Sequence, residues 1–308
     1  MNILVVRNDK LGDFITALPA IYVLKKHNHD NKIIVLVAPI NKELASACGF
    51  IDEVIVDTGL GLWELARELR HVEIDASITL FSNTRVALAQ FLARIPKRIA
   101  PATKIAQIFY THRVTQRRSE VKMAEFEYNL ELTKTLFENI SLEYPKPLLE
   151  LKNSSKSYEN AICFHVGFGG SSDANWTLDE YEILIREALK NNQVVLTFGP
   201  DEKDLMKNMQ ERFKNEDIVF YLSTDGLLEF AKFIRNFKLF VSTSTGTYHL
   251  ASLVGVKTMT FFADTLFASS KRWRGIGDIK LQKNHMIPKD EEDKEKLFQK
   301  IKIELLAI

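Results

Sequence analysis

Short runs of β-branched and other apolar residues alternate with longer amphipathic segments along most of the chain. In the first half, strands are expected at 2–7, 32–38, 53–56 and 75–80, and helices at 12–26, 41–48, 61–70 and 84–94. After residue 160 the alternation starts again, with strands expected at 161–166, 193–198, 218–222, 238–242 and 257–262, and helices at 178–190, 201–214, 226–236, 247–254 and 290–306. Strands that alternate with helices form βαβ units with parallel strands. The sequence therefore predicts an α/β protein with two similar halves.

The segment 143–160 interrupts this alternation and is the best candidate for a linker. It contains two prolines and is rich in Ser, Lys and Asn. A length of 308 residues is about twice that of a common domain. We therefore expect a first domain over 1–150, a second over 158–289, and a terminal helix within 290–308.

Composition excludes several classes of protein. Lys and Arg number 41 and Asp and Glu 40, so a generally nucleic-acid-coating protein is not expected. Two cysteines, Cys48 and Cys163, cannot form a disulfide framework, and no His spacing suggests a metal site. The most apolar run, 33–40, is far shorter than the roughly 20 residues of a membrane span. A cytoplasmic protein without metal or cofactor is expected.

The turn after the first expected strand carries the first candidate for chemistry. Gly12 permits close approach of the backbone, and Asp13 falls at the start of the next helix. An aspartate there is either a helix cap or a general base. Asp9 is the competing carboxylate in the same turn.

Three turns of the second half have the composition of phosphate or nucleotide sites. Glycines with Ser171 and Ser172 follow one strand, and Glu202 follows the next. The run 242–249 leads into a helix through small hydroxyl residues, and backbone amides at such a start bind phosphates. Its candidate ligands are Ser244, Thr245, Gly246, Thr247 and His249. His249 either reaches the same phosphate or packs between helix and sheet.

The segment 94–122 is strongly basic in an otherwise balanced chain. It holds one acid, Glu120, against Arg94, Lys97, Arg98, Lys104, Arg113, Arg117, Arg118 and Lys122. Such a run is either a solvated loop region or a surface for an anionic partner, such as a phosphorylated glycolipid or a membrane face.

Several of these segments together resemble glycosyltransferase family 9, which includes the bacterial ADP-heptose:lipopolysaccharide heptosyltransferases. The opening ILVVRNDKLGDFITALPAIYVLKK is similar to the family's first strand, Gly-Asp turn and helix. IDASITLFSNTRVALAQFLARIPKRIAP resembles its fourth strand, helix and fifth strand. HVGFGGSSDANWTLDEYEIL, FGPDEKDL and STSTGTYHLASLVGVKTMTFFAD resemble its nucleotide-binding turns.

The resemblance implies a GT-B architecture, in which two Rossmann-like domains face each other across a cleft and the terminal helix crosses back to the first domain. It also implies inverting, metal-independent transfer of a heptose or related sugar from an ADP-sugar, with ADP-heptose as the expected donor. Asp13 would be the general base, and the second domain would bind the donor. The acceptor would be an anionic lipopolysaccharide core, and the enzyme would contact the inner membrane face transiently. Acceptor contacts are expected from Lys10, Gly12, Arg94, Lys97, Arg98, Arg113, Arg117 and Arg118.

Two positions depart from the family pattern. Ser244 stands where the family has Asp before Thr-Gly, and Ala174 stands where it has Lys two residues before Trp. These changes indicate a different donor sugar, a substitute cation such as Lys10 or Arg272, or weakened catalysis. The alternatives are a nucleotide-sugar-binding protein and a two-domain sugar-nucleotide epimerase.

Overall fold

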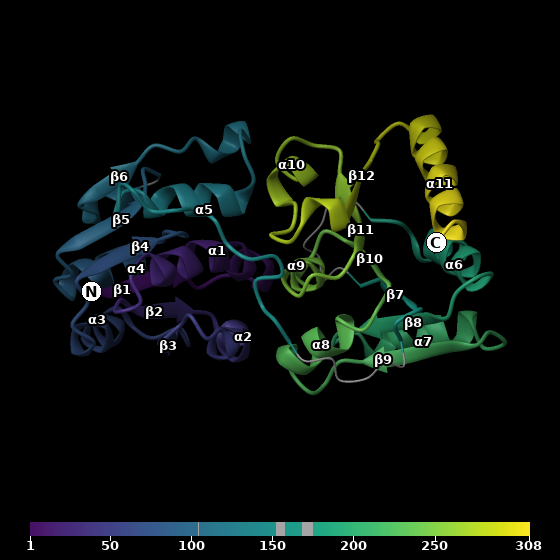
Figure 1. Ribbon diagram of the computed structural model, residues 1–308, viewed down its shortest axis with the longest axis horizontal. Coiled ribbons are helices and arrows are strands. Elements are labelled where there is room, and N and C mark those ends of the chain that lie inside the picture. The colour runs from purple at the N-terminus through teal and green to yellow at the C-terminus, as the bar shows by residue number, and fades with distance from the viewer. Residues whose placement is uncertain (104, 152–157, 168–174) are drawn as a thin grey trace. The chain divides into compact units, whose positions relative to one another are not determined.

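The computed structural model describes residues 1–103, 105–151, 158–167 and 175–308. The chain divides into two compact units, Met1–Pro145 and Lys146–Ile308. The point of division lies within the segment that the sequence suggests as a linker. Over the described residues, each unit holds a six-stranded sheet whose paired strands are all parallel, with helices packed around it (Figure 1).

The first unit has the strand order β3-β2-β1-β4-β5-β6. Its strands are β1 (Asn2–Arg7), β2 (Lys32–Val37), β3 (Glu53–Val56), β4 (Ala76–Thr79), β5 (Lys97–Pro101) and β6 (His112–Val114). Its α-helices are α1 (Leu11–His27), α2 (Lys42–Ala47), α3 (Leu62–His71), α4 (Thr84–Leu92) and α5 (Glu125–Thr133). Short 3-10 helices occur at η1 (Pro39–Asn41), η2 (Ile105–Phe109) and η3 (Arg118–Glu120).

The second unit has the order β12-β11-β10-β7-β8-β9. Its strands are β7 (Ile162–His165), β8 (Val194–Phe198), β9 (Ile218–Leu222), β10 (Leu239–Thr243), β11 (Thr258–Ala263) and β12 (Gln282–Ile287). Its helices are α6 (Leu178–Leu189), α7 (Lys203–Arg212), α8 (Leu227–Ile234), α9 (Gly246–Leu253), α10 (Ser270–Trp273), η4 (Ile279–Leu281) and α11 (Glu291–Leu306).

The central strands are buried on both faces, as parallel strands covered by helices must be. β1 and β2 are apolar and buried except at their ends, and β7, β8, β10 and β11 are wholly buried, although β10 and β11 each include two hydroxyl residues. The terminal helix α11 packs on α6 and places Phe298, Ile301 and Leu305 in the core of the second unit (Figure 1). Its expected crossing to the first unit stays a prediction.

The strand order of each sheet reverses at one place. In the first unit the chain runs outward from β1 to β3 and returns with β4 on the other side of β1. In the second unit, β7 to β9 run one way and β10 pairs with the opposite side of β7. Ligands of such sheets bind beyond the carboxyl ends of the strands at this switch point. The loops after β1 and β4, and after β7 and β10, therefore hold the candidate sites.

Candidate functional site

Asp13 lies at the switch point of the first sheet, in the first turn of α1. The helix begins after Lys10 without a side-chain cap, so Asp13 does not serve as the N-cap. Its carboxylate instead accepts a hydrogen bond from the Nη2 of Arg7, the last residue of β1. The side chain is about one-fifth exposed. The structure therefore presents Asp13 as a partly exposed, oriented carboxylate at the edge where ligands bind.

Arg7 is the centre of a charged cluster that the sequence analysis did not identify. Its side chain is only 4% exposed, its Nε donates to Asp9 at 2.9 Å, and its Nη1 lies 3.6 Å from the Oε1 of Glu125 in α5. Glu125 is also buried and accepts a hydrogen bond from Arg118. Burial lowers the pKa of Arg7, but the three carboxylates beside it outweigh burial and raise that pKa, so the guanidinium stays charged.

Asp9 is the carboxylate of this cluster whose charged form is destabilised. Burial raises the pKa of Asp9 to about 6, the charge of Asp13 adds to the rise, and Arg7 opposes it. Among the described residues, Arg7 contacts Asp9, Asp13 and Glu125, and Arg118 also contacts Glu125. A carboxylate with a raised pKa beside fixed cations is typical of functional sites.

A second ion pair lies at the same edge of the sheet. Asp57 follows β3, forms an ion pair with Arg85 in α4, and accepts a hydrogen bond from the side chain of Asn8 at 2.5 Å. Burial raises the pKa of Asp57, but the hydrogen bonds from Arg85 and Asn8 outweigh it and lower that pKa. Asp57 is thus a stably charged carboxylate, in contrast to Asp9.

In the second unit, Glu202 lies where the turn after β8 leads into α7. Its Oε2 accepts a hydrogen bond from the backbone N–H of Gly199 at 2.7 Å and lies 3.9 Å from the Nε2 of His165. A Cβ on Gly167 would lie 1.9 Å from the Oε1 of Glu202, so this carboxylate occupies space that only glycine leaves open. Burial lowers the pKa of His165, which favours its neutral form.

The turn after β10 presents the start of α9. Thr245 precedes the helix, and its hydroxyl lies 2.8 Å from that of Thr247. Gly246 is the first residue of α9, and Ser244 is half-buried just before it. Within the described part of the chain, no side chain caps this helix start. Binding of an anion by its first amides stays a prediction.

His249 is buried one turn into α9. Its ring lies 5.0 Å from the ring of Tyr248 and 6.4 Å from that of Trp273, and its Nδ1 has no partner among the described residues. Burial lowers the pKa of His249 to about 4, so it is neutral near pH 7. Nearby Arg272 is 8% exposed and stacks over Phe267 at 3.7 Å and over Trp273 at 5.0 Å.

Ser171, Ser172 and Ala174, together with Lys104, lie outside the described residues. Among the described residues, no group of three His, Cys, Asp or Glu side chains has a metal-site arrangement. No helix in that part of the chain is long and apolar enough to cross a membrane.

The basic segment is divided between the two edges of the first sheet. Because β4, β5 and β6 run parallel to β1, Arg94 and Lys97 lie at the amino edge, where β5 begins, and Arg117 and Arg118 follow the carboxyl end of β6. The structure thus brings Arg118 into the Asp13 cluster and places Arg94 and Lys97 away from it. The segment is not a plain loop region, because β5, η2, β6 and η3 lie within it.

The side chains of this segment also differ in how they are engaged. Arg98 donates from its Nε to the carbonyl of Phe109 at 2.7 Å and from its Nη1 to the carbonyl of Ile95. Arg117 is exposed and pairs with Glu120 at 3.4 Å, while Arg113 is exposed on the edge strand β6. Lys10 is exposed beside half-buried Gly12 in the turn that leads to Asp13.

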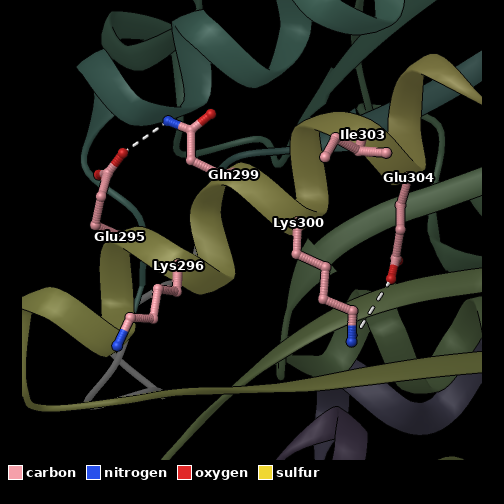
Figure 2. A pocket seen from close by; sticks show the side chains of 6 residues that line it. All are labelled: Glu295, Lys296, Gln299, Lys300, Ile303 and Glu304. Carbon is pink, nitrogen blue, oxygen red and sulfur yellow. Dashed lines mark hydrogen bonds and ion pairs between the residues drawn. The ribbon is translucent and has the colours of Figure 1, made fainter.

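A hollow of about 580 Å³ on the surface of α11 does not resemble a nucleotide site (Figure 2). It is lined by residues of this one helix, namely Glu295, Lys296, Gln299, Lys300, Ile303 and Glu304. Gln299 donates to Glu295 at 2.7 Å, and Lys300 lies 3.9 Å from Glu304, so polar groups here satisfy one another.

Two switch-point sites in two parallel α/β units define a GT-B-like protein, and comparison with known proteins agrees. The sequence model of glycosyltransferase family 9 (heptosyltransferase) matches residues 62–302. A putative glycosyltransferase of Haemophilus influenzae is 34% identical over 300 residues, covering 90% of this chain and 86% of that protein. The chain belongs to glycosyltransferase family 9, as the resemblance indicated, and is a glycosyltransferase.

Solved structures confirm the fold. The Escherichia coli ADP-heptose lipopolysaccharide heptosyltransferase II aligns with a TM-score of 0.80 at 17% identity, over 100% of this chain and 99% of that one. The E. coli heptosyltransferase WaaC with ADP aligns with a TM-score of 0.77 at 18% identity, over 98% and 100%. The predicted GT-B-like architecture of two Rossmann-like sheets is thereby confirmed.

Proposed function

We propose that this glycosyltransferase transfers a heptose, or a related sugar, from an ADP-sugar to an anionic lipopolysaccharide core acceptor, with inversion and without a metal. The observation that carries the proposal is the Asp13 carboxylate, partly exposed at the switch point of the first sheet and held by buried Arg7. Family membership and the ADP complex of a structural relative support the adenine nucleotide.

In the proposed mechanism, Asp13 accepts the proton of the acceptor hydroxyl while the oxygen of that hydroxyl bonds to the anomeric carbon of the donor sugar. The bond from that carbon to the pyrophosphate oxygen breaks, and its electron pair leaves with ADP. Arg7 fixes the carboxylate in one orientation, which lowers the entropic cost of reaching the transition state. Glu125 and Asp9 also contact Arg7, which fixes the guanidinium that orients Asp13.

The donor site is proposed to lie at the carboxyl edge of the second sheet. Amides at the start of α9, with the hydroxyls of Thr245 and Thr247, suit the pyrophosphate and stabilise the charge that develops on ADP. The Glu202 carboxylate, held beside Gly167, suits the hydroxyls of a ribose. Ser171 and Ser172 remain proposed phosphate contacts.

Two features suggest how this chain compensates for its departures from the family pattern. Arg272 is a buried cation near His249 and is proposed as the substitute for the lysine replaced by Ala174. Neutral His249 would contribute a hydrogen bond rather than a charge. Ser244, uncharged where the family has Asp, is proposed to alter preference for the donor sugar.

Acceptor contacts are proposed for Lys10 and Gly12 in the Asp13 turn and for Arg113 and Arg117 near the end of β6. A phosphorylated lipid-linked acceptor would bring a cytoplasmic enzyme to the inner face of the membrane. We therefore also propose a transient contact with that face.

Asp13→Asn is the direct test, because the amide oxygen still accepts the hydrogen bond from Arg7 while the base is lost. Acceptor-dependent release of ADP from ADP-heptose should fall about 10²–10⁴-fold in kcat, with the Kd for ADP unchanged. Glu131→Gln, an exposed carboxylate paired with Lys134 in the same unit, is the matched control.

Each deviation has a distinct meaning. Full activity of Asp13→Asn would refute its role as the base. Activity with another sugar nucleotide, but none with ADP-heptose, would refute the proposed donor and leave the base intact. Release of free sugar without an acceptor would indicate epimerase chemistry, and ADP binding without turnover would indicate a binding protein.

A further inference from the structure

Beside the start of β5, the amino edge of the first sheet groups Arg70, Arg94, Lys97 and Arg98, next to exposed Glu73 and Asp75 ahead of β4, and the proposed reaction has no use for this basic group. From Ala76 to Ser119 the sequence contains no Asp or Glu, while Lys or Arg occupies eight positions. The sequence analysis assigned Arg94, Lys97 and Arg98 to the sugar acceptor. Lys97 and Arg98 begin β5 and Arg94 shortly precedes it, whereas the Asp13 turn follows the far end of the parallel strand β1. They therefore need a different partner.

A pocket of about 430 Å³ opens at this edge and combines arginines with apolar walls. Its lining includes Arg70, Arg94 and Arg98 together with Phe91, Ile95 and Pro96. Arg70 donates to the carbonyl of Leu92 at 2.5 Å, and Arg98 is held by two carbonyls. Arginines positioned in this way lose little further entropy when they bind phosphate oxygens.

Exposed apolar side chains lie beside this pocket. Ile105 and Ile108 of η2 are 75% and 65% exposed, and Phe91 of α4 is 49% exposed. These elements pack together, with the rings of Phe91 and Phe109 5.9 Å apart. Apolar side chains next to basic ones are typical of surfaces that enter the headgroup region of an anionic bilayer.

Arg94 follows the end of α4 in a left-handed backbone conformation. Its φ is +62°, and its N–H and that of Ile95 close the helix end by bonding the carbonyls of Phe91 and Gln90 at 3.0 and 3.3 Å. Glycine is the usual residue at this position. Glu73, Arg117 and Val121 also have positive φ, so the conformation carries a cost that glycine would remove and does not by itself assign a role to the side chain.

We propose that the amino-edge surface, defined as Arg70, Phe91, Arg94, Lys97, Ile105 and Ile108, docks on an anionic phospholipid bilayer, with one lipid phosphate in the arginine pocket. This inference rests on the proposed function in one respect: the surface would make the membrane contact that the proposed function includes. Docking requires neither donor nor acceptor, so it can be tested separately.

The experiment measures flotation of the full-length protein with vesicles of phosphatidylcholine alone and of phosphatidylcholine with phosphatidylglycerol. Wild type should float only with the anionic vesicles, and less so at high salt. Each basic residue near such a surface strengthens binding about fivefold, so Arg94→Gln with Lys97→Gln should weaken it about 25-fold. Lys296→Gln with Lys300→Gln removes the same charge from α11 and should bind as wild type does.

Two further variants separate docking from folding. Ile105→Ser with Ile108→Ser should weaken vesicle binding while both residues, being exposed, leave the fold intact. Arg94→Gly should raise the Tm and still weaken vesicle binding, a combination that a purely structural role does not produce.

Three results would overturn the proposal. Equal vesicle binding by the Arg94/Lys97 variant and the α11 control would show that this surface is not used. Flotation that appears only when lipopolysaccharide is added would assign the contact to the acceptor. Binding of inorganic phosphate at the arginine pocket, with vesicle flotation unchanged by that phosphate at constant ionic strength, would assign the pocket to a free anion and not to a lipid.

Discussion

Asp9→Asn should make the first unit more stable, although it removes one side of an ion pair. Burial raises the pKa of Asp9 to about 6, which is about two units above that of an ordinary aspartate. Each unit corresponds to about 1.4 kcal/mol, so charged Asp9 costs the folded state up to about 3 kcal/mol above pH 6. The amide of asparagine retains an acceptor for the Nε of Arg7. We expect a gain of about 1–3 kcal/mol near pH 7.5.

The sign of the pH dependence follows from the raised pKa. Below about pH 4, Asp9 is protonated when folded and largely protonated when unfolded, so it costs little there. The cost grows between about pH 4 and pH 6 and is complete above it. Urea denaturation followed by circular dichroism should therefore show the gain of Asp9→Asn near pH 7.5 and almost none near pH 4.

Asp57→Asn is the matched control with the opposite sign. Hydrogen bonds from Arg85 and Asn8 outweigh burial and lower the pKa of Asp57. The charge of Asp57 therefore stabilises the folded state at pH values above the unfolded pKa. This contribution is lost as the pH falls through the folded pKa. Asp57→Asn should thus destabilise the protein near pH 7.5 and less so near pH 4. The reasoning is refuted if Asp9→Asn loses stability near pH 7.5, or gains equally at both pH values.

Three other predictions concern the same features. Arg7→Met should destabilise the protein by about 3–5 kcal/mol in urea denaturation, since buried carboxylates lose their cation; a loss under about 1 kcal/mol would contradict the cluster. Gly167→Ala should displace the Glu202 carboxylate and raise the Kd for ADP in calorimetry, and an unchanged Kd would remove Glu202 from the nucleotide site. Arg94→Gly should stabilise the fold by about 1 kcal/mol, seen as a higher Tm, and a lower Tm would contradict the strain assigned to its φ.

The sequence predicted what local patterns encode. Buried strands such as β1 and β8 carry continuous apolar runs, and helices such as α6 carry a capping box, Thr177 with Glu180, so both kinds of element were placed within a few residues. The helix start at Gly246 was likewise visible as small hydroxyl residues after a buried strand.

The missed elements lack such patterns. β6 and β12 are edge strands with polar, partly exposed residues, and β5 begins with Lys97 and Arg98, so none has an apolar run. β5 was indicated only by the family resemblance, and α5 is short with little periodicity.

The Arg7 cluster could not be predicted from the sequence for a different reason. Its members come from β1, from the following turn and from α5, and only folding brings them together. The single local signal was an arginine that ends a buried strand, which indicates a partner without identifying it. Placement of Arg94 at the opposite edge from Asp13 also required the parallel register of β5.

The position of α5 has a consequence for how the protein is made. Arg7 leaves the ribosome long before Glu125, which is supplied near the end of the first unit. Asn129, also in α5, donates to the carbonyl of Thr16 at 3.1 Å and ties the same late helix to α1. A nascent chain that ends before α5 must keep Arg7 hydrated or bury it without one of its counter-charges. The first unit should therefore complete its folding in one cooperative step only after α5 emerges, and any earlier intermediate should leave the β1 end of the sheet open to water.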